Sequence, residues 1–150
     1  MAFAPEFTGA DGERFLPLEN NVPEVQAIQQ LLNGDIYTDT AASRQQFMET
    51  AAAYQIIHLA THGKSDANIG DYSFLAFTAS SDSTQERLLY AKDIYNLSLN
   101  ADMVVLSACE TGDGEFFKGE GVISLGSAFF YAGAKSIVTS LWNVNDQTTA

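Results

Sequence analysis

The sequence is poor in cysteine and histidine, which restricts the chemistry that it can carry. Its one cysteine, Cys109, has no partner for an internal disulfide. One cysteine and two histidines are also too few for the four-ligand cages of structural zinc sites. His58 and His62 lie four positions apart, but Leu59 replaces the glutamate of the zinc-peptidase motif, and the segment reads as a strand rather than a helix. We therefore expect no metal ion.

Several other catalytic and cofactor motifs are incomplete. Gly112 and Gly114 begin a dinucleotide-binding pattern, but position 117 is phenylalanine instead of the third glycine. No glycine-rich loop is followed by the lysine of a phosphate-binding loop. The segment 121–126 misses the spacing of a hydrolase nucleophile elbow by one residue, so Ser124 reads as an ordinary helix serine. We therefore expect no cofactor.

Positive charge is also scarce. Seven lysine and arginine residues face 19 aspartate and glutamate residues, for a net charge of −12. This balance disfavours direct contact with nucleic acid or with an anionic membrane, because both contacts need clustered cations. The acidic residues are spread along the chain, which indicates a solubilising surface or, alternatively, a preference for basic partners. No apolar run reaches about 18 residues and no signal peptide is visible, so we expect a soluble, cytoplasmic protein.

The 150 residues are enough for one domain with a sizeable core. Short apolar runs rich in β-branched residues alternate with longer helical patterns, which is typical of an α/β fold with a mainly parallel sheet. We expect strands at 2–4, near 36, and at 56–60, 103–108 and 136–141, with a small hairpin at 73–77 and 88–90. We expect helices at 23–32, 41–54, 93–97 and 122–132, and a further helix from Asp146. Asn21 and Thr40 are the expected caps of the first two helices, and Gly34 is the expected stop of the first.

Both ends of the chain read as cut. The chain starts inside an expected strand and stops in the first turn of an expected helix. We therefore expect residues 1–150 to be a fragment of a longer domain or protein. An incomplete sheet would leave an unpaired edge.

His62 and Cys109 are the residues that carry chemistry. Each directly follows an apolar strand, and in open parallel sheets reactive groups lie just beyond the carboxyl ends of the strands. Their separation of 47 positions suits one crossover between neighbouring strands. A thiolate nucleophile needs a base, and a histidine serves near neutral pH. The backbone amides of Gly63 and Cys109 would then face a developing oxyanion.

Structural roles remain open beside these functional ones. Cys109 also fits a buried thiol, and His62 also fits a strand-end histidine bonded to backbone. His58 lies within an apolar strand and is expected to be a satisfied core histidine. Ser107, two positions before Cys109, fits the substrate pocket or strand packing equally. Glu110 fits a residue that holds the dyad or a loop amide, or a solvated carboxylate that braces its loop.

Five blocks of the chain together resemble the CHAT domain, a caspase-like peptidase module that is related to separase and is often found beside TPR repeats in bacteria. The blocks are HLATHG, LSACETG, GEG, FFYAGAKSIVTSLWNVND and the spacing of Leu16-Pro17, Glu24 and Ile28. The resemblance implies a caspase-hemoglobinase-like three-layer sandwich with a Cys–His dyad. His62 would be the general base and acid, Cys109 the nucleophile that forms a thioester, and Gly63 a donor to the oxyanion. In caspases the histidine precedes the cysteine by about 50 residues, which agrees with this assignment.

The resemblance also implies a specificity pocket. In separase-like enzymes the block that reads Leu141 to Asp146 here lines the primary pocket. Asp146 would form an acidic wall that selects lysine or arginine, with Trp142 in the core or the pocket wall. Family members continue beyond this block with a helix and further sheet elements, which agrees with a fragment.

The segment 110–121 contains four glycines and is expected to be an adaptable loop. We expect low activity in isolation and activation by a partner, such as TPR repeats or another regulatory domain. The first functional hypothesis is therefore a cysteine endopeptidase that acts on a protein or peptide. The second is a non-catalytic peptide-binding module of a bacterial signalling or defence protein, which keeps the fold and uses its cleft for binding.

Overall fold

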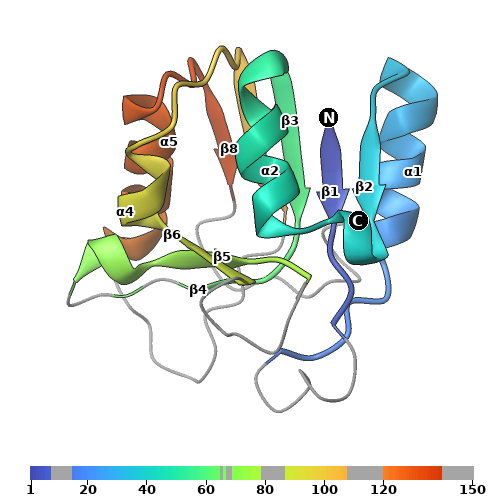
Figure 1. The fold of residues 1–150 in the computed structure, drawn as a ribbon, viewed down its shortest axis with the longest axis horizontal. Helices are drawn as coiled ribbons and strands as arrows, with labels where there is room; N and C mark the ends of the chain where they lie inside the picture. Colours follow the sequence, from blue (N-terminus) through green and yellow to red (C-terminus); the bar gives the residue numbers. More distant parts are fainter. Residues whose placement is uncertain (8–14, 65, 67–68, 79–86, 108–119, 140–150) are drawn as a thin grey trace.

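The fold is seen in a computed structural model that describes residues 1–7, 15–64, 66, 69–78, 87–107 and 120–139, the side chains of 120–124 excepted. Within these residues, the strands of the main sheet run parallel in the order β2-β1-β3-β7-β8 (Figure 1). Their bounds are β1 Ala2–Ala4, β2 Ile36–Thr38, β3 Ile56–Ala60, β7 Met103–Ser107 and β8 Ile137–Thr139. A smaller antiparallel sheet has the order β4-β5-β6, with β4 at Gly63–Lys64, β5 at Phe74–Ala76 and β6 at Leu88–Tyr90.

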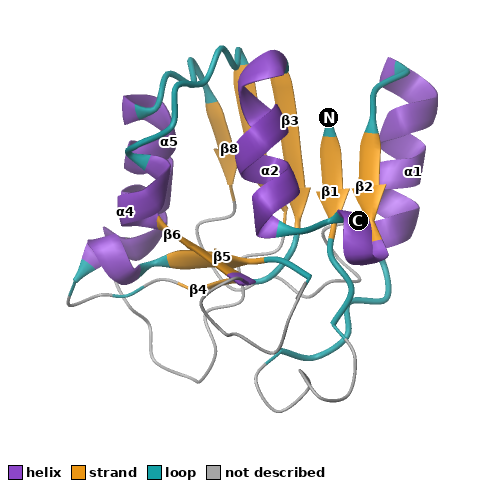
Figure 2. Cartoon of the chain, viewed as in Figure 1, coloured by secondary structure: helices purple, strands orange, loops and turns teal. Residues whose placement is uncertain are grey.

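Helices cover both faces of the main sheet (Figure 2). The helices are α1 at Asn21–Leu32, α2 at Arg44–Thr50, α4 at Ala91–Ile94 and α5 at Glu120–Tyr131. Odd-numbered side chains of β3, such as Ile57 and Leu59, join the large core with residues of α2, α4 and α5. Ala60 on the other face packs with Val25 of α1. The expected three-layer α/β fold with a mainly parallel sheet is therefore confirmed.

The first helix ends at Leu32 as predicted, but it begins two residues earlier than predicted and is capped by other residues. Asn20 is its N-cap, whereas Asn21 is the first helical residue. The side chain of Asn21 is buried and donates from Nδ2 to the carbonyl oxygen of Pro5 at 2.8 Å. At the other end Asn33, rather than Gly34, takes the left-handed conformation, with φ of 51°. Asparagine tolerates this conformation because its short polar side chain bonds locally.

The predicted helix over 41–54 is shorter and is capped elsewhere. Ser43, rather than Thr40, accepts a hydrogen bond from the backbone of Gln46 at 3.1 Å. After Thr50 the chain continues as a 3₁₀ turn instead of an α-helix. The hydroxyl of Thr50 donates to the carbonyl of Gln46, a local bond of the kind that competes with regular helix.

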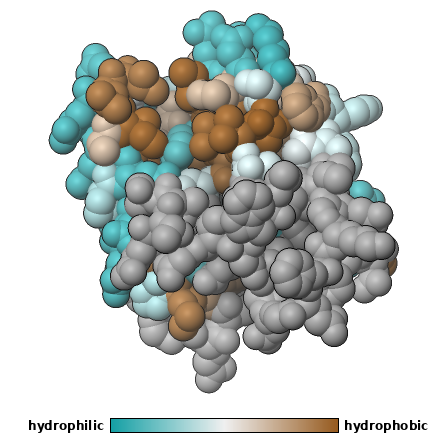
Figure 3. All heavy atoms as spheres, turned by 180° about the vertical axis from the view of Figure 1, so that it is seen from behind, coloured by the Kyte–Doolittle hydropathy of each residue, from teal (hydrophilic) through white to brown (hydrophobic). Residues whose placement is uncertain are grey.

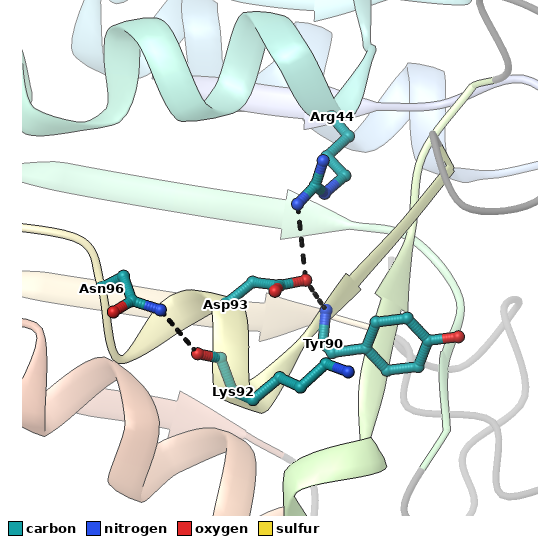
Figure 4. Close-up of polar contacts among 5 residues, drawn as sticks. All are labelled: Arg44, Tyr90, Lys92, Asp93 and Asn96. Atoms are coloured by element: carbon teal, nitrogen blue, oxygen red, sulfur yellow. Dashed lines mark hydrogen bonds and ion pairs between the residues drawn. The ribbon is translucent and has the colours of Figure 1, made fainter.

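The small sheet and α4 are joined to α2 by one carboxylate (Figure 4). Oδ2 of Asp93 accepts hydrogen bonds from the backbone N–H of Tyr90 at 3.2 Å and from Nη2 of Arg44 at 3.4 Å. Lys92 Nζ lies 4.8 Å and 5.2 Å from the ring centres of Tyr72 and Tyr90. These contacts fix the hairpin that follows His62 against the rest of the domain.

We predict that Gly133→Ala destabilises the fold. Gly133 follows α5 and has φ of +113°, a conformation that side chains rarely adopt. A Cβ there would lie 2.4 Å from the carbonyl oxygen of Leu99. We expect a loss of about 1–3 kcal/mol in the free energy of unfolding, measured by urea denaturation.

Gly126→Ala is the matched control for that prediction. Gly126 lies within α5, where a Cβ would meet only Ile137 Cγ2, at an ordinary 4.0 Å. Alanine stabilises a helix interior by about 1 kcal/mol relative to glycine, so this variant should be as stable as the original chain or more so. Equal stability of the Gly133→Ala variant and the original chain would contradict the clash.

The two longest helices in the described part of the chain, α1 and α5, have 12 residues each. A membrane-spanning helix needs about 20. Within the ranges that the structure describes, no helix is therefore long and apolar enough to cross a membrane.

Candidate functional site

The candidate site lies at the carboxyl end of the main parallel sheet. His62 comes two residues after the end of β3 and is only 2% exposed. β3 pairs with β7 along its whole length, and Ala60 lies opposite Ser107 at the end of the ladder. The prediction that the strand before His62 and the strand before Cys109 are adjacent and parallel is therefore confirmed.

The imidazole of His62 is held between aromatic side chains and one backbone carbonyl. Its ring stacks on Phe15 with centroids 5.5 Å apart and meets the edge of Phe7 at 4.8 Å. Nε2 lies 2.6 Å from the carbonyl oxygen of Leu16. A carbonyl oxygen only accepts hydrogen bonds, so Nε2 carries the hydrogen and the neutral ring has its lone pair on Nδ1. The segment at 15–16 thereby fixes both the orientation and the tautomer of the imidazole.

Thr61 locks the turn that presents His62. Its backbone N–H donates to the carbonyl of Ser107 at 3.2 Å, and its buried hydroxyl donates to the carbonyl of Ala76. One residue therefore ties the end of β3 both to β7 and to the small sheet. This explains why a threonine stands directly before the histidine.

The backbone N–H and C=O of Gly63 point away from the neighbouring strand β5. The N–H of Ala76 donates to the carbonyl of His62 at 2.8 Å, so these two residues form a hydrogen-bonded pair of the antiparallel ladder. Such pairs alternate with non-bonded pairs, and Gly63 opposite Leu75 is the next one. The N–H of buried Gly63 therefore points away from β5 and takes no part in the ladder between β4 and β5.

The predicted site residues divide into two groups. His62, Gly63 and Ser107 lie together at the ends of β3, β4 and β7, and Ser107 is buried on the same sheet face as Ala60. Cys109, Glu110, Trp142 and Asp146 lie outside the described residues. So do residues 110–119 of the predicted loop, whereas its last two residues, 120 and 121, belong to α5.

His58 is confirmed as a satisfied core histidine. Its Nε2 lies 2.7 Å from Oε1 of Glu24 in the first turn of α1, and the two side chains are 10% and 13% exposed. Among the described residues no group of three or more histidine, cysteine, aspartate or glutamate side chains is arranged to hold a metal ion. The contact between His58 and Glu24 joins α1 to β3, the strand that precedes His62.

We predict that Glu24→Ala destabilises the fold by about 1–3 kcal/mol, because it leaves a buried imidazole nitrogen without its partner. Thermal or urea unfolding measures the loss. Glu49→Ala is the matched control, since Glu49 accepts only an exposed bond from Gln45 and should change stability by less than about 0.5 kcal/mol. Equal effects of the two substitutions would contradict a structural role for the buried pair.

Three contributors to the site were not predicted from the sequence. Leu16 acts through its carbonyl, a group that every residue carries, so side-chain chemistry gives no signal for it. Phe7 and Phe15 are far from His62 along the chain, and their hydrophobicity indicates only burial. The proline after Leu16 was the visible signal of an extended backbone at that point.

The comparisons with known proteins agree with this geometry. The family model described as "CHAT domain" matches residues 4–150. The chain is also similar to tetratricopeptide repeat protein 28 of Homo sapiens, with 26% identity over 173 residues that cover 93% of this chain and 7% of that protein. The CHAT family is related to caspase-like cysteine peptidases, and the parallel sheet with His62 at its carboxyl end suits that relation. The chain belongs to the CHAT domain family.

Proposed function

We propose that the chain is a cysteine endopeptidase that uses His62 and Cys109 as a catalytic dyad. The register of the central strands is the main support. Each β7 residue pairs with the β3 residue 47 positions before it, and Cys109 follows His62 by the same 47 positions. Continued for two residues, this register would make the two residues neighbours across the ends of adjacent strands.

The orientation of His62 suits a general base. With the hydrogen on Nε2 held by Leu16, Nδ1 has the lone pair that takes the thiol proton of Cys109. The thiolate attacks the scissile carbonyl, and the backbone amides of Gly63 and Cys109 stabilise the oxyanion. The imidazolium then gives its proton to the leaving amine as the carbon–nitrogen bond breaks. The acyl part of the substrate stays on Cys109 as a thioester. His62 activates a water molecule that hydrolyses the thioester and restores the thiol.

The substrate pocket is proposed from the family pattern. Asp146 would favour lysine or arginine before the cleaved bond, with Trp142 and Ser107 as further walls. Ser107 is in a suitable place, because it ends β7 and is buried beside Ala60. The net charge of −12 favours basic substrates in general but selects no position.

We predict that Asp146→Ala changes which side chain is accepted before the cut. A peptide library should show basic residues preferred by the original chain, and a preference reduced about tenfold or more in the variant, because a pocket carboxylate is lost. Asp71→Ala on the exposed turn after β4 is the control and should leave the preference unchanged. An unchanged preference in the Asp146→Ala variant would remove that residue from the pocket.

A non-catalytic peptide-binding module is the second candidate. The buried, aromatic-packed imidazole of His62 favours it, because a structural histidine would be held in the same way. An electrophilic peptide probe distinguishes the two functions. A thiol no more reactive than free cysteine, with labelling unaffected by His62→Ala, indicates the binding module.

We also propose that a neighbouring segment of a longer protein activates the site. The similarity to a tetratricopeptide repeat protein, of which this domain corresponds to only 7%, supports repeats as that partner. Cleavage by the isolated chain should then be slow and should rise when the partner is added. Full activity of the isolated chain would contradict this part of the proposal.

A further inference from the structure

A second feature lies at the opposite end of the main sheet from His62. A cavity of about 210 Å³ opens where the strands begin, beside the last turns of α1. Its lining includes the residue before β1 and the first residues of β2 and β3, namely Met1, Ile36 and Ile56. His62 lies beyond the other end of β3, so a molecule in this cavity would not occupy the proposed catalytic site.

The walls of the cavity are mainly apolar. Ile28 and Leu32 of α1 face Ile36 and Ile56 of the sheet across it. Pockets for drug-sized molecules usually measure about 300–1,000 Å³, so this cavity is better matched to one large side chain. The size and the lining therefore indicate an apolar anchor residue rather than a whole small molecule.

The surface around the cavity is apolar as well. Leu31 and Leu32, at the end of α1, are 83% and 57% exposed. Seen from behind in Figure 3, hydrophobic side chains gather on the upper part of the molecule, where the strands begin. Leu32 also lines the cavity, and an exposed leucine at the rim of a cavity is a feature that a docking peptide covers.

The charge at the cavity is acidic. Asp35 is on its lining, where it accepts a hydrogen bond from the hydroxyl of Tyr54 at 2.6 Å, and no lysine or arginine is among the lining residues. The bond to Asp35 raises the pKa of Tyr54, so the phenol stays a donor. The nitrogen of Met1 donates to the carbonyl of Ile56 at 2.7 Å, so its hydrogen bond goes to the sheet.

We infer that this cavity is a docking site for a protein segment that presents one large apolar side chain next to a lysine or arginine. The apolar residue fills the cavity, Leu32 covers its flank, and the cation lies by Asp35. Charge complementarity selects this partner over an acidic one and over a second copy of the chain, whose net charge is also −12.

Peptide display on the full chain tests the inference, with counter-selection against a Gly34→Leu variant. Gly34 lines the cavity, and a Cβ there would meet only the Met1 nitrogen, at an ordinary 4.0 Å, so a leucine has room to enter. We expect enriched peptides with a leucine, isoleucine, methionine or phenylalanine within two positions of a lysine or arginine. Peptides without a basic residue, or no peptide that survives counter-selection, would overturn the inference.

Affinity measurements with one enriched peptide then locate the contacts. Gly34→Leu should weaken binding by about tenfold or more, because the new leucine fills the cavity and excludes the apolar side chain of the peptide. Ser127→Leu, which adds a leucine on the exposed side of α5, should not. Asp35→Asn should weaken binding about threefold and reduce its salt dependence, whereas Asp71→Asn should do neither. Circular dichroism confirms that each variant is folded.

The docking site and the proposed peptidase are tested separately. His62→Ala should leave the affinity for the selected peptide unchanged, whether or not the chain cleaves peptides. Binding that is lost in His62→Ala but kept in Gly34→Leu would show that the peptide occupies the catalytic cleft, and it would overturn the docking site. A third outcome is that the chain alone, without peptide, self-associates and that Gly34→Leu abolishes this self-association. This result would show that a second copy of the chain, rather than a peptide, occupies the cavity.

Discussion

Cys109→Ala is expected to abolish peptide cleavage, with a loss of at least about 10⁴-fold in kcat/KM, because removal of a covalent nucleophile leaves only the contribution of substrate binding and oxyanion donors. The measurement is turnover of a basic fluorogenic peptide, made in the presence of the activating partner if the isolated chain is slow. No other cysteine exists in the chain to replace it.

Two controls define that result. Cys109→Ser keeps the shape of the residue but supplies a poorer nucleophile, so it should be nearly as inactive as alanine. Gly126→Ala, within α5, should cleave as the original chain does, since its added Cβ meets only an ordinary contact. Turnover that survives in Cys109→Ala would assign the cleavage to another group or to a contaminant.

His62→Ala is expected to lower kcat by about 10²–10⁴-fold, the usual contribution of a positioned general acid–base group. The loss should appear mainly in kcat, because the ring bonds to Leu16 and is predicted to act on the reacting groups rather than to hold the substrate. Kinetics on the same peptide measure the split between kcat and KM.

The only other histidine provides the matched control. His58→Gln keeps a donor for Glu24 and should reduce stability slightly while kcat stays close to that of the original chain. Equal losses of kcat in the two variants would indicate that both act through the fold. That outcome would remove the special role of His62.

The sequence was informative where hydrophobic patterns are strong. The apolar runs at 56–60 and 103–108 predicted buried parallel strands, which the structure has at Ile56–Ala60 and Met103–Ser107. Their order in the sheet places His62 where reactive groups gather. Strand neighbours could be inferred because the offset of 47 positions between His62 and Cys109 suits one crossover between adjacent strands. The blocks HLATHG and LSACETG pointed to the family because each combines a strand with the reactive residue that follows it.

Other features depend on distant contacts that local patterns do not encode. The two-residue strand β4 exists because Gly63 and Lys64 pair with Leu75 and Phe74, which no period-two pattern of two residues can signal. Asn21 was expected as a cap but is buried, because its side chain bonds to the carbonyl of Pro5, which lies 16 positions earlier in the chain. The carbonyl of Leu16 became part of the site through the path of the backbone alone.

The pH dependence of alkylation at Cys109 tests the dyad most directly, because it needs neither the substrate nor the partner. Free cysteine is only about 1% thiolate at pH 6.5. If His62 takes the thiol proton, iodoacetamide should label Cys109 at that pH about tenfold or more faster than free cysteine, and His62→Ala should remove the advantage. A rate equal to that of free cysteine, unchanged by His62→Ala, would contradict the proposed dyad.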